Sequence, residues 1–293
     1  MSEGPTVSFE FFPPHSPAAE SQLWTVMEKL APLSPTFFSV TYGAGGSTRS
    51  RTERLVDRVH KSMPVAPAAH LTCVGATRAE IDAMARKWWQ SGIRHIVALR
   101  GDPPQGETAS TPHPEGYSNA AALVEGLRKI ADFEISVAGY PEMHPASPNL
   151  AADLDNLKRK VDAGARRVLT QYFFDNSLFY RFRDSAVAAG IEVPIVPGIL
   201  PVTNFAKVVE FSEKCGTSVS PEMAKQFDGL DSDPETRNLI AASVAIEQCE
   251  DLLAHGVDAF HFYTLNRAAL TYAICWRLGM RPTPLDGPGA DAA

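Results

Sequence analysis

The stretch Val7-Ser8-Phe9-Glu10-Phe11-Phe12-Pro13-Pro14 reads as a short, strongly apolar β-strand that the two prolines bring to an end. Side chains alternate along a strand, so Glu10 lies on the opposite face from the phenylalanines at positions 9 and 11. A carboxylate near the end of a buried strand is costly unless it is paired, hydrogen-bonded or protonated. Glu10 is therefore either a satisfied structural acid or a residue that does chemistry.

The composition is that of a soluble globular enzyme, with 293 residues, 44% hydrophobic and 21% charged. The net charge of -7 argues against a nucleic-acid partner, and no apolar run approaches the ~20 residues that span a bilayer. The four cysteines lie far apart without CxxC spacing, which favours reduced thiols over disulfides or a zinc site. Residues 1–5 do not resemble a signal peptide. We therefore expect a cytoplasmic protein with no membrane partner and no metal site.

Strand-like and helix-like runs alternate along the whole chain. Strands are expected near 7–12, 37–42, 66–72, 93–99, 134–140, 167–171, 193–199 and 259–264. Helices are expected at 16–30, from the loop after 42 to about 62, after a capping box at 77–80, and at 119–131, 148–163, 176–189, 204–214, 221–227, 234–254 and 267–278.

This alternation predicts an α/β fold, a single (β/α)8 TIM barrel over residues 1–280. A doubly wound sheet is the alternative, but it would place a phosphate loop after the first strand, where Pro13-Pro14 stands. Residues 281–293 are rich in Pro, Gly, Ala and Asp, and we expect them to form a disordered tail.

In this fold the active site lies at the carboxyl ends of the strands. Nearly every expected strand ends in a polar or aromatic residue, and these residues are Glu10, Thr41, Tyr42, His70, Thr72, Arg100, Gly101, Asp102, Tyr140, Gln171, Tyr263 and Thr264. Alternation in the fourth strand predicts that Arg100 and Asp102 face the same way. A structural ion pair between Glu10 and Arg100 is the alternative for that pair, and a hydrogen-bonded core histidine is the alternative for His70. The occurrence of all of them at one face favours a site.

Some barrel chemistries do not fit. The nine lysines fall in expected helices and loops, which argues against a Schiff-base aldolase, and the histidines show no HxH or HExxH pattern of a metal hydrolase. An acid–base site beside a bound organic cofactor remains. In the helix at 148–163, Asp153, Asn156 and Lys160 form a polar stripe, which is either a solvated face or a row of hydrogen bonds to a ribityl or ribose chain.

The motifs in their order resemble the methylenetetrahydrofolate reductase family. The matching segments are 8–14 (SFEFFPP), 40–44 (VTYGA), 70–73 (HLTC), 98–102 (ALRGD), 138–145 (AGYPEMHP), 157–165 (LKRKVDAGA), 170–175 (TQYFFD), 197–201 (PGILP) and 261–267 (HFYTLNR). The resemblance implies an FAD-bound barrel that interconverts 5,10-methylenetetrahydrofolate and 5-methyltetrahydrofolate in one-carbon metabolism. It implies NADH or NADPH as the donor and a homo-oligomer as the assembly.

The resemblance also implies roles for individual residues. Glu10 matches the family's general acid, and a protonated carboxyl in an apolar barrel mouth suits that role near neutral pH. Asp102, ionised, would stabilise the cationic iminium that forms when the folate ring opens. Residues that match FAD contacts are Thr41, Tyr42, Ala44, His70, Arg100, Gly101, Asp102, Tyr140, His144, Asp153, Asn156, Arg159 and Lys160, with Tyr117 assigned by its position rather than by a motif. Residues that match folate contacts are Gln171, Phe211 and Arg267, and Lys207 is included although the family carries a glutamine near that position.

Two other functions stay open from the sequence. One is a flavin-free pterin methyltransferase barrel, which would bind folate but no flavin. The other is a folate- or flavin-binding protein without catalysis, which would bind both ligands and turn over neither.

Overall fold

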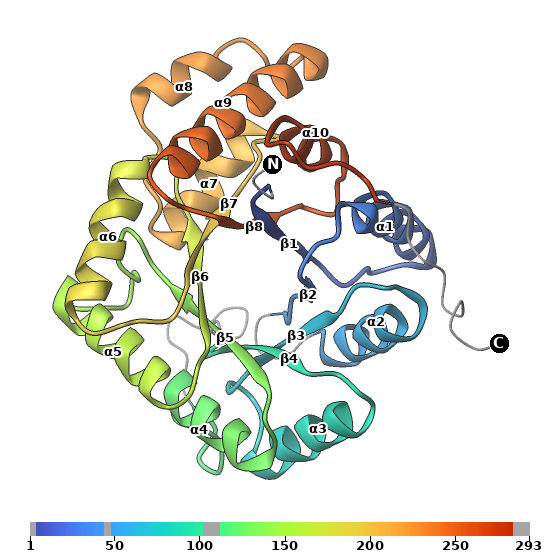
Figure 1. The fold of residues 1–293 in the computed structure, drawn as a ribbon, viewed down its shortest axis with the longest axis vertical. Helices are drawn as coiled ribbons and strands as arrows, with labels where there is room; N and C mark the ends of the chain where they lie inside the picture. Colours follow the sequence, from blue (N-terminus) through green and yellow to red (C-terminus); the bar gives the residue numbers. More distant parts are fainter. Residues whose placement is uncertain (1–3, 44–47, 102–111, 284–293) are drawn as a thin grey trace.

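The computed structural model describes residues 4–43, 48–101 and 112–283. Eight parallel strands form a closed barrel in the order in which they follow one another in the sequence (Figure 1). The strands are β1 (Thr6–Phe11), β2 (Phe38–Val40), β3 (Pro67–Thr72), β4 (His95–Leu99), β5 (Glu134–Gly139), β6 (Arg167–Tyr172), β7 (Ile195–Ile199) and β8 (Ala259–Tyr263). The predicted single (β/α)8 barrel is confirmed.

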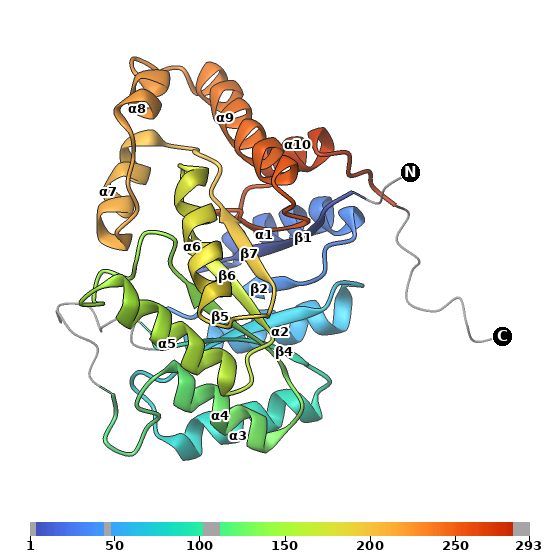
Figure 2. The ribbon, with the colours of Figure 1, turned by 60° about the vertical axis from the view of Figure 1, so that its left-hand side comes forward.

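Helices surround the barrel. They are α1 (Pro17–Leu30), the 3-10 turn η1 (Ala31–Leu33), α2 (Arg49–Ser62), α3 (Arg78–Gln90), α4 (Ala120–Ile130), α5 (Leu150–Asp162), α6 (Asn176–Ala188), α7 (Phe205–Cys215), α8 (Pro221–Phe227), α9 (Pro234–Ala254) and α10 (Ala269–Arg277). Figure 2 shows α7, α8 and the start of α9 standing out from the ring beside α6. Within the described residues, none of the helices combines the length and the hydropathy that crossing a membrane requires.

Side-chain caps explain most helix starts. The Ser16 hydroxyl accepts from the Ala19 N–H at the start of α1, and Thr77 with Glu80 forms the predicted capping box of α3. Asn149 caps α5, so Pro148 stands before that helix and not inside its first turn as predicted. The remaining differences from the predicted helix bounds are one or two residues.

The strands are shorter at some ends than predicted. β2 covers only Phe38–Val40 because its register with β1 and β3 extends over those residues alone. Thr41 and Tyr42 therefore lie in the loop that follows the strand, although the Thr41 N–H still donates to the Phe11 carbonyl at 3.0 Å. The shortening moves two predicted site residues from the sheet to its rim.

Alternation sorts the barrel residues into two layers. Phe9, Ile96 and Ala98 belong to the large cluster between sheet and helices, whereas Val97 and Leu99 belong to the small cluster around Phe37 inside the barrel. Ile96 and Ala98 therefore face the helices, and β4 ends at Leu99. Arg100 therefore lies one residue beyond the strand, where the alternation of side chains no longer applies. The direction of the Arg100 side chain is set by the loop that follows β4.

The end of the described chain packs back on its beginning. The Arg281 guanidinium lies 4.2 Å from the Trp276 ring centre, and the Thr283 N–H donates to the Pro32 carbonyl at 2.8 Å. Residues 281–283 of the predicted tail thus make defined contacts, and residues 284–293 lie outside the described residues.

Candidate active site

Glu10 lies inside the barrel between two imidazoles. Its Oε2 atom is 3.3 Å from Nε2 of His70 on β3 and 3.5 Å from Nε2 of His261 on β8. The other ring nitrogen of His261, Nδ1, is 2.7 Å from the Ser8 hydroxyl, two residues before Glu10 on the same strand. The contact with His70 lacks the direction of a hydrogen bond, so His70 Nε2 has no hydrogen-bond partner. β1, β3 and β8 thus bring a buried acid and two bases together.

The histidines decide the charge of this acid. Burial is the largest single influence and raises the pKa of Glu10, but the charge of the adjacent His70 and the charge and hydrogen bond of His261 together outweigh it and lower the pKa to about 2. The prediction that an apolar mouth keeps this carboxyl protonated is therefore wrong, because two imidazoles flank it. The alternative of a Glu10–Arg100 ion pair is also not observed, since Arg100 contacts His144.

Tyr263 covers one side of the acid. Its hydroxyl donates to the Thr170 carbonyl at 2.8 Å, and its ring lies edge-on to His261 at 5.5 Å between ring centres. The tyrosine fits because Gly198 faces it: a Cβ at that position would come within 2.6 Å of the Tyr263 ring. Burial, followed by the charge of Glu10, raises the pKa of Tyr263, so its phenol stays neutral.

A second polar group lies at the ends of β4 and β5. Arg100 Nη2 is 3.5 Å from Nε2 of His144, whose ring lies edge-on to Tyr140 at 4.6 Å between ring centres. Asp153 accepts from the His144 N–H at 3.2 Å and from the Ser147 hydroxyl at 2.7 Å, so it holds the loop between β5 and α5. These contacts bring Tyr140, His144 and Asp153 together.

The polar stripe of α5 faces the barrel and not the solvent. Asp153 and Lys160 are only 6% and 5% exposed, and Lys160 Nζ donates to the Ala138 carbonyl at 2.5 Å. Burial lowers the pKa of Lys160 to about 8, with Asp153 opposing and Arg100 adding to the shift. The solvated-face alternative is wrong for these two residues.

The other members of the α5 motif are less buried. Asn156 is half-buried, and Arg159 points to solvent, where its Nε atom lies 3.1 Å from Asp155. Leu150, the first residue of α5, is 47% exposed.

Three further predicted cofactor residues lie around the rim. Thr41 and Tyr42 follow β2 and are half-buried, and burial raises the pKa of the Tyr42 phenol. Gly101 has φ +95°, and a Cβ there would come within 2.8 Å of the Thr72 side chain. Ala44 and Asp102 lie outside the described residues.

Tyr117 lies in the helical layer. Its hydroxyl donates to Asp82 on α3 at 2.7 Å, and a Cβ at Gly126 on α4 would come within 2.1 Å of that hydroxyl. Arg78 stacks over the ring at 5.2 Å. The structure therefore gives Tyr117 contacts with α3 and α4 and does not bring it to the Glu10 cluster.

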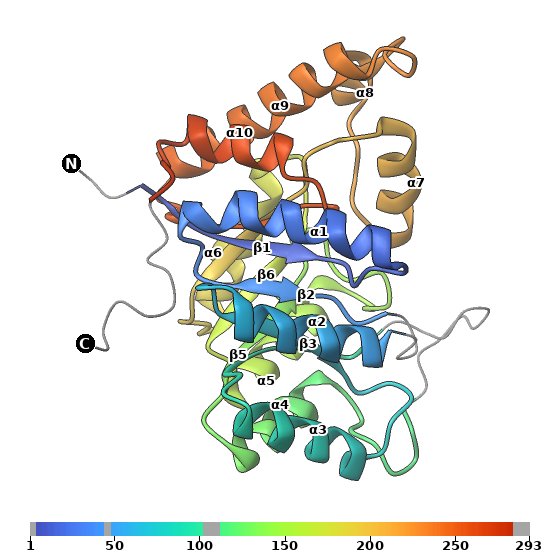
Figure 3. The same ribbon diagram turned by 90° about the vertical axis from the view of Figure 1, so that its right-hand side faces the viewer.

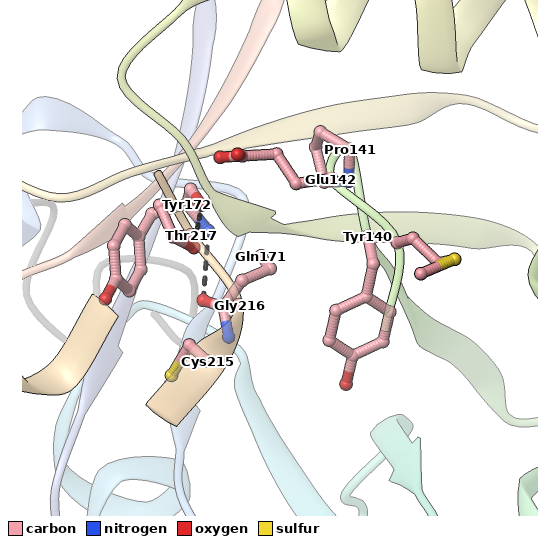
Figure 4. Close-up of a pocket in the computed structure, with 9 residues that line it drawn as sticks. Tyr140, Pro141, Glu142, Gln171, Tyr172, Cys215, Gly216 and Thr217 are labelled. Atoms are coloured by element: carbon pink, nitrogen blue, oxygen red, sulfur yellow. Dashed lines mark hydrogen bonds between the residues drawn. The ribbon is translucent and has the colours of Figure 1, made fainter. Parts of the chain in front are cut away.

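The predicted folate residues lie on the side of β6, β8 and α7. Figure 4 shows Gln171 and Tyr172 of β6 around a small pocket with Tyr140, Glu142 and the residues that follow α7. The Phe211 ring of α7 is 52% exposed and stacks on Tyr172 at 6.1 Å. Figure 3 shows α7 near the end of the molecule toward which β1 runs, which is the rim that carries Glu10.

Two charged folate candidates are exposed at this side. Lys207 lies on the first turns of α7, and Arg267 follows β8. The Arg267 N–H donates to the Thr264 carbonyl at 2.9 Å, which closes a tight turn after the strand. Both side chains are exposed, and their roles remain predictions.

Ser8 and His261 were not among the residues predicted for the site. A signal was available, because Ser8 and Glu10 alternate with apolar residues in β1, and His261 and Tyr263 do so in β8. Ser8 and His261 meet only because the barrel closes between β1 and β8, which brings together residues 253 positions apart. The sequence alone does not show this contact. Within the described part of the chain, no group of three His, Cys, Asp or Glu residues is placed to hold a metal.

Comparison with known proteins agrees with these observations. The family profile described as methylenetetrahydrofolate reductase matches residues 1–279. The 5,10-methylenetetrahydrofolate reductases of Salmonella typhimurium and Escherichia coli K12 are each 50% identical over 276 residues, which is 94% of this chain and 91% of those proteins. An Arabidopsis thaliana protein named methylenetetrahydrofolate reductase (NADH) 1 is 36% identical over 284 residues, 93% of this chain and 48% of that protein.

A solved structure shares the fold. It is a protein from Clostridium thermocellum that binds two copies of 5-methyl-5,6,7,8-tetrahydrofolic acid, with a TM-score of 0.61, 13% identity and 94% of each chain covered. At that identity the likeness concerns the barrel alone. The profile match and the 50% identity show more: this chain belongs to the methylenetetrahydrofolate reductase family of oxidoreductases.

Proposed function

We propose that the protein is a flavin-dependent reductase that converts 5,10-methylenetetrahydrofolate into 5-methyltetrahydrofolate, with FAD as cofactor and NADH or NADPH as donor. The observation that carries the proposal is the Glu10 carboxylate held within 3.3 and 3.5 Å of two imidazoles at the carboxyl ends of the barrel strands. Family membership supports the substrate. We also propose that the enzyme works in the cytoplasm as a homo-oligomer.

The reaction needs a proton on the nitrogen that departs when the folate ring opens, because only the open iminium carbon accepts hydride. Glu10 is the group placed to deliver that proton, with His70 and His261 at 3.3 and 3.5 Å from its Oε2 atom. A bound ligand that covers the mouth excludes water, and this desolvation raises the pKa of the carboxyl and favours its protonated form.

The residues at the rim fit FAD. The hydroxyl of Thr72, next to His70 in the barrel lining, is buried without a hydrogen-bond partner, and Arg100 and Lys160 lie close enough that Arg100 lowers the pKa of Lys160. A phosphate group would relieve that conflict between two cations. When bound, FAD supplies the transfer of hydride from the nicotinamide to the folate.

Residues on several elements would hold the cofactor. They are Thr41, Tyr42, Ala44, His70, Arg100, Gly101, Asp102, Tyr140, His144, Asp153, Asn156, Arg159 and Lys160. Tyr117, which packs against α3 and α4, is also proposed as a cofactor contact. Asp153 would act by holding the loop that carries His144, since its carboxylate already binds that loop. Asp102 would stabilise the cationic folate.

The folate would lie on the β6 and β8 side, where Gln171 faces the pocket and Phe211 offers an exposed ring for stacking. Lys207 and Arg267 would bind the carboxylates of the glutamate tail. The nicotinamide would occupy the same place before the folate does.

A visible spectrum under anaerobic conditions tests the proposal. The purified protein should be yellow, its released flavin should be FAD, and NADH, NADPH and 5-methyltetrahydrofolate should be added separately to see which bleaches it. Colourless protein that binds folate but cannot be reconstituted with FAD would instead indicate a methyltransferase-type barrel. Protein that binds both ligands without bleaching would indicate a binding protein.

Glu10→Gln tests the acid. The variant should keep the FAD spectrum and flavin reduction by the nicotinamide, and lose at least 100-fold in folate turnover, the size expected for removal of a general acid. Glu134→Gln is the matched control, because Glu134 begins β5 at the opposite end of the barrel and pairs with Arg166. Folate reduction at the wild-type rate by Glu10→Gln would remove Glu10 from the acid role.

A further inference from the structure

A tight turn follows β8 directly at the rim. The Arg267 N–H donates to the Thr264 carbonyl at 2.9 Å, and both central residues have left-handed backbones, Leu265 at φ 50° and Asn266 at φ 55°. A leucine in this region is strained and persists only where surrounding contacts fix it. The turn is therefore held by more than its own sequence.

The contacts that hold it come from the strand that carries Glu10. The Asn266 amide accepts from the Phe12 N–H at 2.9 Å and donates to the Phe12 carbonyl at 3.0 Å, so one side chain satisfies both main-chain groups of that residue. The Thr264 hydroxyl donates to the Glu10 carbonyl at 2.6 Å and accepts from the Asn266 N–H at 3.1 Å. The end of β1 and the turn after β8 thus form one hydrogen-bonded unit.

This unit carries two groups of the proposed site on its two sides. Glu10 is in β1, two residues before Phe12, and Arg267 directly follows Asn266. β1 has ended at Phe11, so beyond it the Asn266 amide takes the place of a pairing strand. If that amide is lost, the main chain of Phe12 loses both bonds and the strand end is free to shift.

We propose that Asn266 is a positioning residue that fixes the Glu10 end of β1 relative to Arg267. It thereby keeps the general acid and the site for the folate tail at a constant position relative to one another. The inference rests on the proposed function. It implies that the folate half of the reaction depends on Asn266 and that flavin reduction does not, because the nicotinamide needs neither a proton from Glu10 nor a contact for a glutamate tail.

Three substitutions separate the effect of the Asn266 side-chain amide from the effect of the backbone conformation of the turn. Asn266→Gly removes the side chain but keeps a residue that favours positive φ. Asn266→Asp keeps the acceptor for the Phe12 N–H and loses the donor to the Phe12 carbonyl. Leu265→Gly is the matched control, because it relaxes the same turn and leaves the amide in place.

The experiment compares the two half-reactions of the FAD-loaded proteins by stopped flow, together with the Kd for FAD and the Tm. Asn266→Gly should reoxidise with methylenetetrahydrofolate at least tenfold more slowly, with a raised KM for folate, while FAD binding and reduction by the nicotinamide stay within twofold of wild type. The reoxidation rate of Asn266→Asp should lie between those of Asn266→Gly and wild type, and the rate of Leu265→Gly should match wild type.

Three outcomes would overturn the inference: equal losses in both half-reactions, an unchanged folate half-reaction in Asn266→Gly, or the same folate defect in Leu265→Gly. If Asn266→Gly does not fold, the same comparison is made with Asn266→Asp. Wild-type protein that takes up no FAD, or is not reoxidised by folate, would instead refute the proposed function, so the two failures are distinguishable.

Discussion

Lys160 is a buried cation that lies close to a second cation, Arg100, at the rim of the barrel. It is 5% exposed, its ammonium donates to a single main-chain carbonyl, and burial together with Arg100 lowers its pKa to about 8 against the pull of Asp153. The unfolded chain binds this proton with the ordinary pKa of 10.5. Between pH 8 and 10.5 the unfolded state therefore holds more protons, and stability rises with pH.

The difference between wild type and Lys160→Met isolates this contribution. Below pH 8 the wild type bears the full penalty of a buried cation, and by pH 9.5 about 2 kcal/mol of that penalty should be relieved. Urea unfolding of cofactor-free proteins at pH 7 and 9.5 measures the change. Lys129→Met on α4, where the side chain is 71% exposed, controls for loss of a lysine charge. A wild-type-minus-variant difference that does not grow with pH would contradict the shifted pKa of Lys160.

The limits of sequence reasoning at this scale follow from distance along the chain. The isolated carboxylate in β1 was recognisable because alternation makes any polar residue in an apolar strand stand out. Its partner His261 was not, because the two are 251 residues apart and meet only through closure of the barrel. The predicted protonation of Glu10 failed for the same reason, since a pKa depends on neighbours that the local sequence does not name.

At the scale of elements, the bounds of helices and strands were predictable to within one or two residues, and the pairing between strands was not. A helix start is a local event, in which a cap such as Thr77 satisfies the N–H groups of the first turn. A strand end depends on how far its neighbours pair with it. β6 shows this most clearly, because its register with β7 shifts between Leu169 and Tyr172, and nothing in its own sequence indicates the irregularity.

That irregularity makes Gly198 of β7 a critical position. Its N–H donates to the Thr170 hydroxyl at 2.9 Å, and a Cβ would come within 2.2 Å of the Thr170 carbonyl and 2.6 Å of the Tyr263 ring. Gly198→Ala must therefore push β6 away or displace Tyr263 from the side of Glu10.

We expect Gly198→Ala to lower the free energy of unfolding by about 1–3 kcal/mol, as overpacking of a close contact does. Urea denaturation with a tyrosine-sensitive probe measures it. Gly4→Ala is the control, because its nearest neighbouring atom would be 3.8 Å away and ordinary van der Waals contact results. Equal stability of the two variants would show that β6 yields to the added methyl group.

At the scale of the whole molecule, the beginning and end of the chain are joined twice. At the rim that carries Glu10, the turn after β8 binds the end of β1 through Thr264 and Asn266. At a second place, Thr283 binds the 3-10 turn after α1, through its N–H to the Pro32 carbonyl at 2.8 Å and its hydroxyl to that of Ser34 at 2.8 Å. Closure of the sheet between β1 and β8 is thus supported from outside the sheet.

The contacts of Thr283 with Pro32 and Ser34 predict how far the chain can be shortened from its carboxyl end without loss of stability. A chain that ends at Met280 loses the Arg281–Trp276 stacking and the Thr283 hydrogen bonds, which together contribute roughly 2 kcal/mol. For a chain of 293 residues that loss should lower the Tm by about 3 °C. A chain that ends at Thr283 keeps all these contacts and should melt at a higher temperature than the chain that ends at Met280. Scanning calorimetry of the three proteins at equal concentration measures the shifts. If the chains ending at Met280 and Thr283 melt together, residues 281–283 belong functionally to the tail that the sequence predicted, and β1 and β8 are held by the sheet and the rim turn alone.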